Sequence, residues 1–282
     1  MRPPRLPQAA ARLMSARHAN PTLFERAVDA TRQPIFNVPL VVLIMAAVLG
    51  LIHAVLAFVL SQEETDVVLR LFAFTPARYS SNLPEGVLLG GWGAGIWTFV
   101  TYAFLHSGLN HLFFNLLWLV AFGTPVARRF GGLRFFAFFL ATAAAGAAAH
   151  LALHVDEWAM MIGASASVSG AIAAAMRFAF QRGGPLRVLG GGDDRAYRVP
   201  AVPLVAMLRN PRLIVFVVVW FGINLLFGLD TFAFPGVDAS IAWEAHIGGF
   251  LAGLFGFALF DPVRNSPALD HPQEPNGASM DH

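Results

Sequence analysis

The chain is a succession of long apolar runs separated by shorter polar connections. A scan with a window of about 19 residues finds six runs that are apolar enough to be membrane spans. These runs cover residues 36–60, 101–126, 134–153, 163–181, 213–229 and 241–260. A helix needs about 20 apolar residues to cross a hydrocarbon core of roughly 30 Å, so the lengths of these runs suit a bilayer. The pattern predicts an all-α, polytopic membrane protein with a bundle of six transmembrane helices.

Composition supports this class of protein and narrows the available chemistry. Hydrophobic residues make up 56% of the chain and charged residues only 13%, whereas about a quarter of the residues are charged in soluble domains. The chain contains no cysteine and no lysine. It therefore cannot use a thiol nucleophile, a thiolate metal site or a serine–lysine dyad, and histidine is the main remaining base.

Arginine placement predicts the orientation of the spans. We divide the chain into a basic N-terminal segment (1–35), a six-helix membrane domain (36–262) and a tail expected to be disordered (263–282). Six arginines lie in the N-terminal segment, and more gather in the second and fourth connections, while the other connections are acidic or nearly uncharged. The positive-inside rule then places both termini in the cytoplasm. We expect a multi-pass protein of a bacterial inner membrane.

Polar side chains recur near one end of three of these runs. His111 and Asn115 are four residues apart and share one face of the second run. Ser165 lies at the start of the fourth run and His246 near the start of the sixth. In the predicted topology these three positions lie near the same, outer, side. An unpaired hydroxyl or imidazole costs several kcal/mol in hydrocarbon, so polar groups that share one depth indicate a working site.

Small residues would let the helices that carry these groups approach closely. Gly249 and Gly253 follow His246 with a spacing of four, and the fourth run has a row at the same spacing, made of Ala166, Gly170 and Ala174. Such rows allow close contact between membrane helices. Close contact is needed to bring a serine hydroxyl within about 2.6–3.2 Å of a histidine nitrogen on another helix.

The ordered set of motifs resembles the rhomboid intramembrane serine proteases. The resemblance rests on three motifs, which are His111-xxx-Asn115, Gly163-Ala164-Ser165 and Ala245-His246-xx-Gly249-xxx-Gly253. Each motif alone is weak, but their order on alternate spans is specific. The resemblance covers residues 36–262 and implies a six-transmembrane-helix, rhomboid-like bundle.

The resemblance implies a role for each of these residues. Ser165 would be the nucleophile and His246 its general base, in a dyad without an aspartate. His111 and Asn115 would stabilise the oxyanion together with the backbone amide of Ser165. His106 matches a histidine whose role in the family is structural. The glycines expected to support the site are Gly163, Gly249 and Gly253.

The implied activity is hydrolysis of peptide bonds in or near transmembrane segments of membrane proteins. The expected partners are transmembrane protein substrates and the lipid bilayer, with no nucleic acid, no cofactor and no metal ion. Two alternatives belong to other classes: a catalytically inactive rhomboid-like protein that binds transmembrane segments, and an unrelated transporter. The presence of all four polar site residues argues against inactivity, and the sequence shows no convincing internal repeat of the kind common in transporters.

Two positions depart from the usual pattern of the family. Ala166 stands where a glycine is usual, and its extra methyl group beside the nucleophile can narrow the cleft. Ser169 stands where some relatives carry an aromatic residue on which the catalytic histidine stacks. The orientation of His246 then depends on another contact. In the fifth run, Trp220 and Phe221 fit either a lateral gate or a lipid-facing helix.

The remaining polar residues of the runs have simpler interpretations. His150 and His154 are four residues apart, a spacing that suits a metal ion. No carboxylate or third histidine is placed in the sequence to complete such a site, so we expect interfacial or packing roles. His53 is expected to pack or to form a hydrogen bond. Ser167 and Ser169 are expected to line a cavity or pack between helices rather than act as nucleophiles.

Overall fold

The computed structural model describes residues 38–82, 88–186, 194–228 and 242–263. These residues belong to one structural unit, which begins at Val38. The predicted basic segment 1–35 lies outside the described residues, as does the predicted tail beyond its first residue, Val263.

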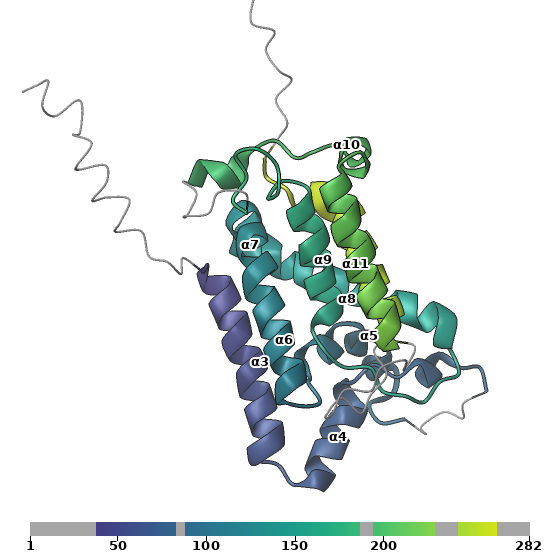
Figure 1. Ribbon diagram of the computed structural model, residues 1–282. Coiled ribbons are helices and arrows are strands. Elements are labelled where there is room, and N and C mark those ends of the chain that lie inside the picture. Colours follow the sequence, from purple (N-terminus) through teal and green to yellow (C-terminus); the bar gives the residue numbers. More distant parts are fainter. Residues whose placement is uncertain (1–37, 83–87, 187–193, 229–241, 264–282) are drawn as a thin grey trace, which may run out of the picture. The chain divides into compact units, whose positions relative to one another are not determined.

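Helices account for nearly all regular structure in the described ranges (Figure 1). The α-helices are α3 (Leu40–Phe58), α4 (Gln62–Phe72), α5 (Gly91–Thr101), α6 (Leu109–Trp118), α7 (Thr124–Phe130), α8 (Gly132–His154), α9 (Ser165–Met176), α10 (Leu204–Leu208), α11 (Pro211–Gly228) and α12 (Trp243–Phe260). Short 3-10 helices occur at η1 (Pro76–Tyr79), η2 (Tyr102–Phe104) and η4 (Asp194–Arg198), and η3 (Leu119–Gly123) is a π-helical turn. The β structure in these ranges is an isolated bridge between Phe74 and Met161. The all-α prediction is confirmed.

Among the described residues, four helical stretches are long and apolar enough to cross a membrane. They are α3, the continuous stretch Leu109–Phe130, α8 and α12. The predicted fourth and fifth spans coincide with shorter apolar helices, Ser165–Met176 and Pro211–Asn224. The 12 residues of α9 extend about 18 Å at 1.5 Å per residue, which is less than the hydrocarbon thickness. The count of six crossings therefore stays a prediction.

The predicted second span, 101–126, begins too early. Helix α6 begins at Leu109, whereas Thr101 ends α5 and the short helix η2 follows it. Between η2 and α6 the backbone is extended at Leu105 and Gly108. A hydropathy window averages over its residues and does not detect backbone conformation. It therefore merges residues 101–108 with the helix α6 that follows them.

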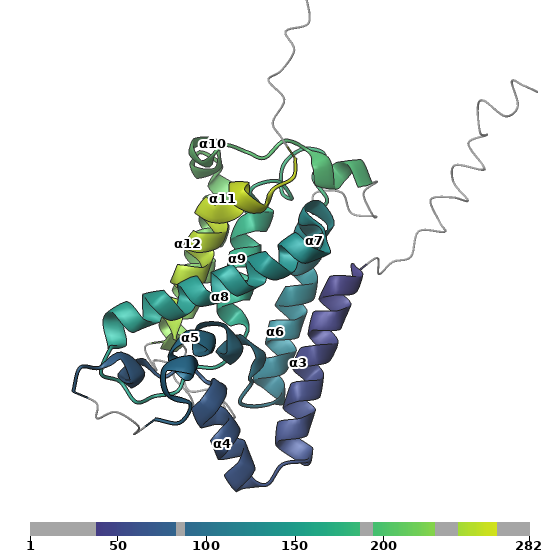
Figure 2. The same ribbon diagram turned by 180° about the vertical axis from the view of Figure 1, so that it is seen from behind.

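Glycines in α12 set its distance from α9. A Cβ at Gly249 would collide with the backbone of Ala166, and one at Gly253 would collide with the backbone of Gly170. The two helices are therefore in backbone contact at successive turns, which confirms the close approach predicted from the small-residue rows. Helix α8 crosses both of them obliquely (Figure 2). A Cβ at Gly170 of α9 would lie 2.6 Å from Cγ2 of Thr142 in α8, so α8 and α9 are also closely packed.

A buried ion pair fixes the C-terminal end of α12. Arg129 of α7 donates from Nε and Nη2 to the carboxylate of Asp261, at 2.9 and 2.8 Å. Its Nη1 donates to the carbonyl oxygens of Tyr197 and Val199, at 3.0 and 2.7 Å. The side chains of Arg129 and Asp261 are 0% and 7% exposed. Each buried charge therefore depends on the other for compensation.

Replacing Gly249 by alanine should destabilise the bundle, because the new methyl group would press on the backbone of Ala166. We expect Gly249→Ala to lower the free energy of unfolding by about 1–3 kcal/mol, as overpacking a core does. Gly256→Ala is the matched control on the same helix, because a Cβ at Gly256 meets nothing within 4 Å. Thermal unfolding of both variants in detergent checks this, and equal melting temperatures would contradict the inferred backbone contact.

Removing the carboxylate of Asp261 should leave the Arg129 guanidinium buried without its counter-ion. We expect Asp261→Ala to lower the free energy of unfolding by about 3–5 kcal/mol. Asp194→Ala is the control, because Asp194 is 89% exposed and lies 3.4 Å from Arg128, where an exposed pair contributes at most about 1 kcal/mol. Unfolding curves of the two variants provide the comparison. A small and equal loss in both would show that burial does not strengthen the Arg129–Asp261 pair.

Candidate active site

Ser165 and His246 are joined directly by a hydrogen bond. Oγ of Ser165 lies 2.6 Å from Nε2 of His246. Ser165 is the first residue of α9, and His246 lies in the first turn of α12. The backbone contact between Gly249 and Ala166 holds these two helix starts side by side. A hydroxyl at this distance from an imidazole nitrogen can transfer its proton directly.

The turn before α9 presents Ser165 at a helix N-terminus. Gly163 in this turn has a φ of 120°, a conformation that residues with a Cβ rarely adopt. The backbone N–H of Gly163 donates to the carbonyl oxygen of Tyr102 at 3.0 Å, which holds the turn against η2. Ser165 therefore stands at the positive end of the α9 dipole, where negative charge is stabilised.

His111 faces the same small volume as Ser165. A Cβ at Gly163 would lie 2.6 Å from Nε2 of His111 and 3.8 Å from Oγ of Ser165. The His111 ring therefore packs against the backbone of Gly163, and any side chain at position 163 would press on that ring. The other ring nitrogen of His111, Nδ1, lies 3.1 Å from Oγ of Ser107, and this contact orients the ring.

Two further histidines support the position of His111. The His106 ring packs edge-on against the His111 ring, with the ring centroids 5.0 Å apart. His53 of α3 hydrogen-bonds through Nδ1 to the carbonyl oxygen of His106 at 3.2 Å. The prediction that His53 packs or forms a hydrogen bond is confirmed. The buried position of His106 fits the structural role that the family resemblance implied.

Asn115 is buried in α6, one turn after His111. Its Nδ2 donates to the carbonyl oxygen of His111 at 2.9 Å. Within the described part of the chain, no hydrogen bond joins Asn115 to Ser165. The oxyanion role of Asn115 therefore stays a prediction.

The residues that follow Ser165 pack between helices. Ala166 is 1% exposed, and a Cβ at Gly146 of α8 would lie 2.5 Å from its methyl group. That methyl group thus fills space between α9 and α8. Oγ of Ser167 donates to the carbonyl oxygen of Phe139 at 2.7 Å, and Oγ of Ser169 to that of Ser165 at 2.7 Å. The packing interpretation of Ser167 and Ser169 is confirmed.

Sequence reasoning missed Asn224, which contacts the other side of the His246 ring. Oδ1 of Asn224 is hydrogen-bonded to Nδ1 of His246. Nδ2 of Asn224 donates to the carbonyl oxygen of Trp220 at 2.6 Å, which identifies Oδ1 as the acceptor. His246 therefore carries its proton on Nδ1 and directs the lone pair of Nε2 at Ser165. The sequence offered one signal for this residue, because Asn224 is a single amide within the apolar run 213–229. An amide side chain in a membrane is costly unless it has a hydrogen-bond partner.

Aromatic contacts hold α11 against α12 beside this hydrogen bond. The Trp220 ring stacks on the Phe250 ring with centroids 5.2 Å apart, and the Phe221 ring meets Phe250 edge-on at 5.3 Å. Val215 and Val218, at 61% and 63% exposure, cover the opposite face of α11. The helix therefore has an outward apolar face and an inward aromatic face, so both interpretations of Trp220 and Phe221 stay open.

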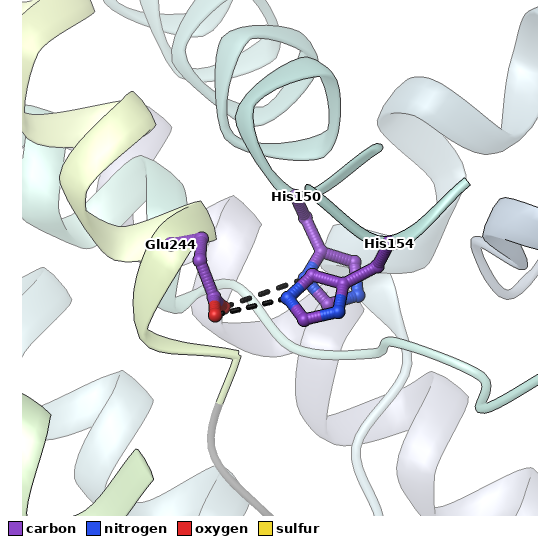
Figure 3. A group of neighbouring side chains, drawn as sticks. All are labelled: His150, His154 and Glu244. Atoms are coloured by element: carbon purple, nitrogen blue, oxygen red, sulfur yellow. Dashed lines mark hydrogen bonds and ion pairs between the residues drawn. The ribbon is translucent and has the colours of Figure 1, made fainter. Parts of the chain in front are cut away.

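A carboxylate lies beside His150 and His154, so the expectation that none does is wrong. Oε1 of Glu244 is 3.0 Å from Nε2 of His154, and Oε2 is 3.5 Å from Nδ1 of His150 (Figure 3). Glu244 is remote from the two histidines in sequence. Packing of α12 against the end of α8 brings the three side chains together.

Comparison with known proteins assigns the chain to one family. A model of the Rhomboid domain matches residues 93–261, which include Ser165, His246 and Asn224. The chain is also 28% identical over 162 residues to a protein named Rhomboid protease GlpG from Serratia proteamaculans (strain 568). That alignment covers 56% of this chain and 46% of the relative, so the chain matches about half of the relative's length. The family model spans more than half of the chain and encloses the whole site, and the chain therefore belongs to the rhomboid family of integral membrane proteins.

Proposed function

We propose that this protein is an intramembrane serine protease that hydrolyses peptide bonds in or near transmembrane segments of membrane proteins. The observation that carries the proposal is the 2.6 Å hydrogen bond between Oγ of Ser165 and Nε2 of His246. Family membership and the name of the similar protein support the same class of reaction.

The first step is attack of the Ser165 oxygen on the carbonyl carbon of the scissile peptide bond. Nε2 of His246 accepts the hydroxyl proton as the new C–O bond forms, and a positioned base of this kind contributes about 10²–10⁴-fold to the rate. His246 then gives this proton to the leaving amine, which leaves an acyl group on Ser165. Water, activated by the same histidine, hydrolyses the acyl group and restores the hydroxyl.

The carbonyl oxygen becomes negatively charged during this attack and needs hydrogen-bond donors. Nε2 of His111 and Oγ of Ser165 lie 2.6 and 3.8 Å from the Cβ position of Gly163, so an oxyanion formed at Ser165 would lie near the His111 imidazole. When Ser107 donates to Nδ1 of His111, Nε2 carries the remaining ring proton and can donate. Asn115 and the backbone amide of Ser165 are the other proposed donors, and removing one such donor costs about 3 kcal/mol of transition-state stabilisation.

The proposed substrates are single membrane-spanning segments that enter the site from the lipid bilayer. Small or helix-breaking residues near the outer boundary would let such a segment unwind and expose its backbone. The Arg-rich connections support an orientation with both termini in the cytoplasm of a bacterial inner membrane. In that orientation the N-terminal ends of α9 and α12 face the outer aqueous phase, which supplies the water for hydrolysis.

Cleavage should depend on Ser165 and His246 but not on Ser167. We expect Ser165→Ala to abolish cleavage and His246→Ala to lower kcat by about 10²–10⁴-fold. Ser167→Ala is the matched control, because its hydroxyl is bonded to the Phe139 carbonyl. The assay is cleavage of a single-span substrate in liposomes, with fluorophosphonate labelling of Ser165. Folded wild-type protein that neither cuts a varied substrate panel nor takes up the probe would favour the inactive, segment-binding alternative.

Asn224 should act as a positioning residue for His246. We expect Asn224→Ala to lower kcat by about 10- to 100-fold with little change in KM, since loss of one buried hydrogen bond costs about 1–3 kcal/mol. Asn224→Asp keeps an acceptor for Nδ1 and should recover most of the rate. Asn210→Ala, at the start of the same helix, controls for general damage to α11. An unchanged kcat in Asn224→Ala would show that packing alone orients the imidazole.

A further inference from the structure

We propose that His150, His154 and Glu244 form a binding site for a zinc-type divalent transition-metal ion. The site joins the C-terminal end of α8 to the first turn of α12. In Figure 3 the two imidazole rings lie one against the other and both face the Glu244 carboxylate. The proposal does not depend on the proposed protease activity, because it uses none of the groups assigned to peptide hydrolysis.

The spacing of the ligand atoms suits a small metal ion. One ligand atom from each of the three residues lies within 4.8 Å of the others. The carboxylate oxygens of Glu244 lie 3.0 Å from Nε2 of His154 and 3.5 Å from Nδ1 of His150. An ion with tetrahedral bonds of about 2.0–2.1 Å separates its ligand atoms by about 3.4 Å. Small side-chain movements would therefore bring all three atoms into one coordination shell.

The hydrogen bonding of His154 favours a cation between it and Glu244. Nδ1 of His154 lies 2.6 Å from Oε1 of Glu157, so that nitrogen carries the ring proton in the neutral imidazole. Nε2 of His154 then lies 3.0 Å from a carboxylate oxygen of Glu244, and this contact needs a positive centre between the two atoms, which is either a second ring proton or a metal ion. A carboxylate that accepts from the remote nitrogen of a ligating histidine is common at zinc sites.

His150 supplies a second, independent indication. The residue is 7% exposed, and its Nδ1 makes no hydrogen bond within the described part of the chain. Oε2 of Glu244 lies 3.5 Å from this nitrogen, an ion-pair contact that is longer than a good hydrogen bond, whereas buried polar atoms normally make one. Coordination of a metal ion by Nδ1 would satisfy it.

Helix packing holds the three ligands at a fixed separation. A Cβ at Gly248 of α12 would lie 2.5 Å from Cβ of Ala149 and 2.7 Å from the carbonyl oxygen of Ala145, both in α8. The two helices therefore touch next to the ligands. Since the site is preformed by this contact, little ordering is needed when an ion binds.

The ligand types select the class of ion. Two imidazoles and one carboxylate suit zinc and similar transition metals, whereas magnesium and calcium prefer oxygen ligands alone. Three protein ligands leave a fourth position for water. The His154 and Glu157 side chains are 24% and 52% exposed, which gives an ion access from the surrounding solution. A bound ion would fix the start of α12, which carries His246 two residues after Glu244.

Direct measurement of metal binding tests the proposal. The protein is the full chain with Ser165→Ala, which prevents self-digestion, purified in detergent without a polyhistidine tag and stripped with a chelator. We expect one saturable Zn²⁺ site per chain by calorimetry, a higher melting temperature with Zn²⁺ but not Mg²⁺, and visible absorption from four-coordinate Co²⁺. Glu244→Gln and His150→Ala should weaken Zn²⁺ binding at least tenfold, and Glu157→Gln by about 10- to 100-fold.

Glu63→Gln on the exposed face of α4 is the matched control and should bind Zn²⁺ like the parent protein. Glu244→Gln keeps the shape of the side chain, so it remains informative if His150→Ala does not fold. No saturable Zn²⁺ site, or equal affinity in Glu244→Gln and the parent protein, would overturn the proposal and leave a proton-linked histidine–glutamate cluster. Proteolysis is not a readout, so failure here is distinct from failure of the proposed function.

Discussion

Backbone contact between α9 and α12 is the constraint from which the arrangement of the site follows. Gly249 and Gly253 meet the backbones of Ala166 and Gly170 at successive turns of the two helices. A side chain larger than hydrogen at either glycine would separate the helices. In lipid, where apolar surfaces gain little by leaving the solvent, such close van der Waals contact is a main source of helix association. Ser165 and His246 lie at the ends of the helices that this contact joins.

A chain of hydrogen bonds joins α11, α12 and α9 beside that contact. It satisfies polar groups for which the apolar surroundings offer no partner. The Trp220 carbonyl accepts from Asn224, Asn224 accepts from His246, and His246 accepts from Ser165. Each member fixes the orientation of the next. Asn224 provides the additional contact that the orientation of His246 required in the absence of an aromatic side chain at Ser169. An amide suits this place, because it accepts from His246 and also donates to the Trp220 carbonyl, whereas a carboxylate can only accept.

Charged and ionisable groups are concentrated at the two ends of α12. Glu244 at its start meets two histidines of α8, and Asp261 after its end pairs with Arg129 of α7. Between these ends the helix is apolar and rich in glycine. Small residues allow close approach in the middle of the helix, and the buried ionic groups at its ends are each compensated by a partner on another helix.

The sequence by itself determined the helical membrane class and the approximate places of the apolar helices, and it predicted Ser165, His246 and His111 as site residues, because hydropathy and motif order are local properties of the chain. It also indicated the glycine contact, since the spacing of small residues is visible without a structure. Only the tertiary structure decided the partner of His246, the packing of the Ala166 methyl group against α8, and the meeting of Glu244 with His150 and His154. Each of these is a contact between helices remote in sequence, and the distances and rotations of packed helices set it.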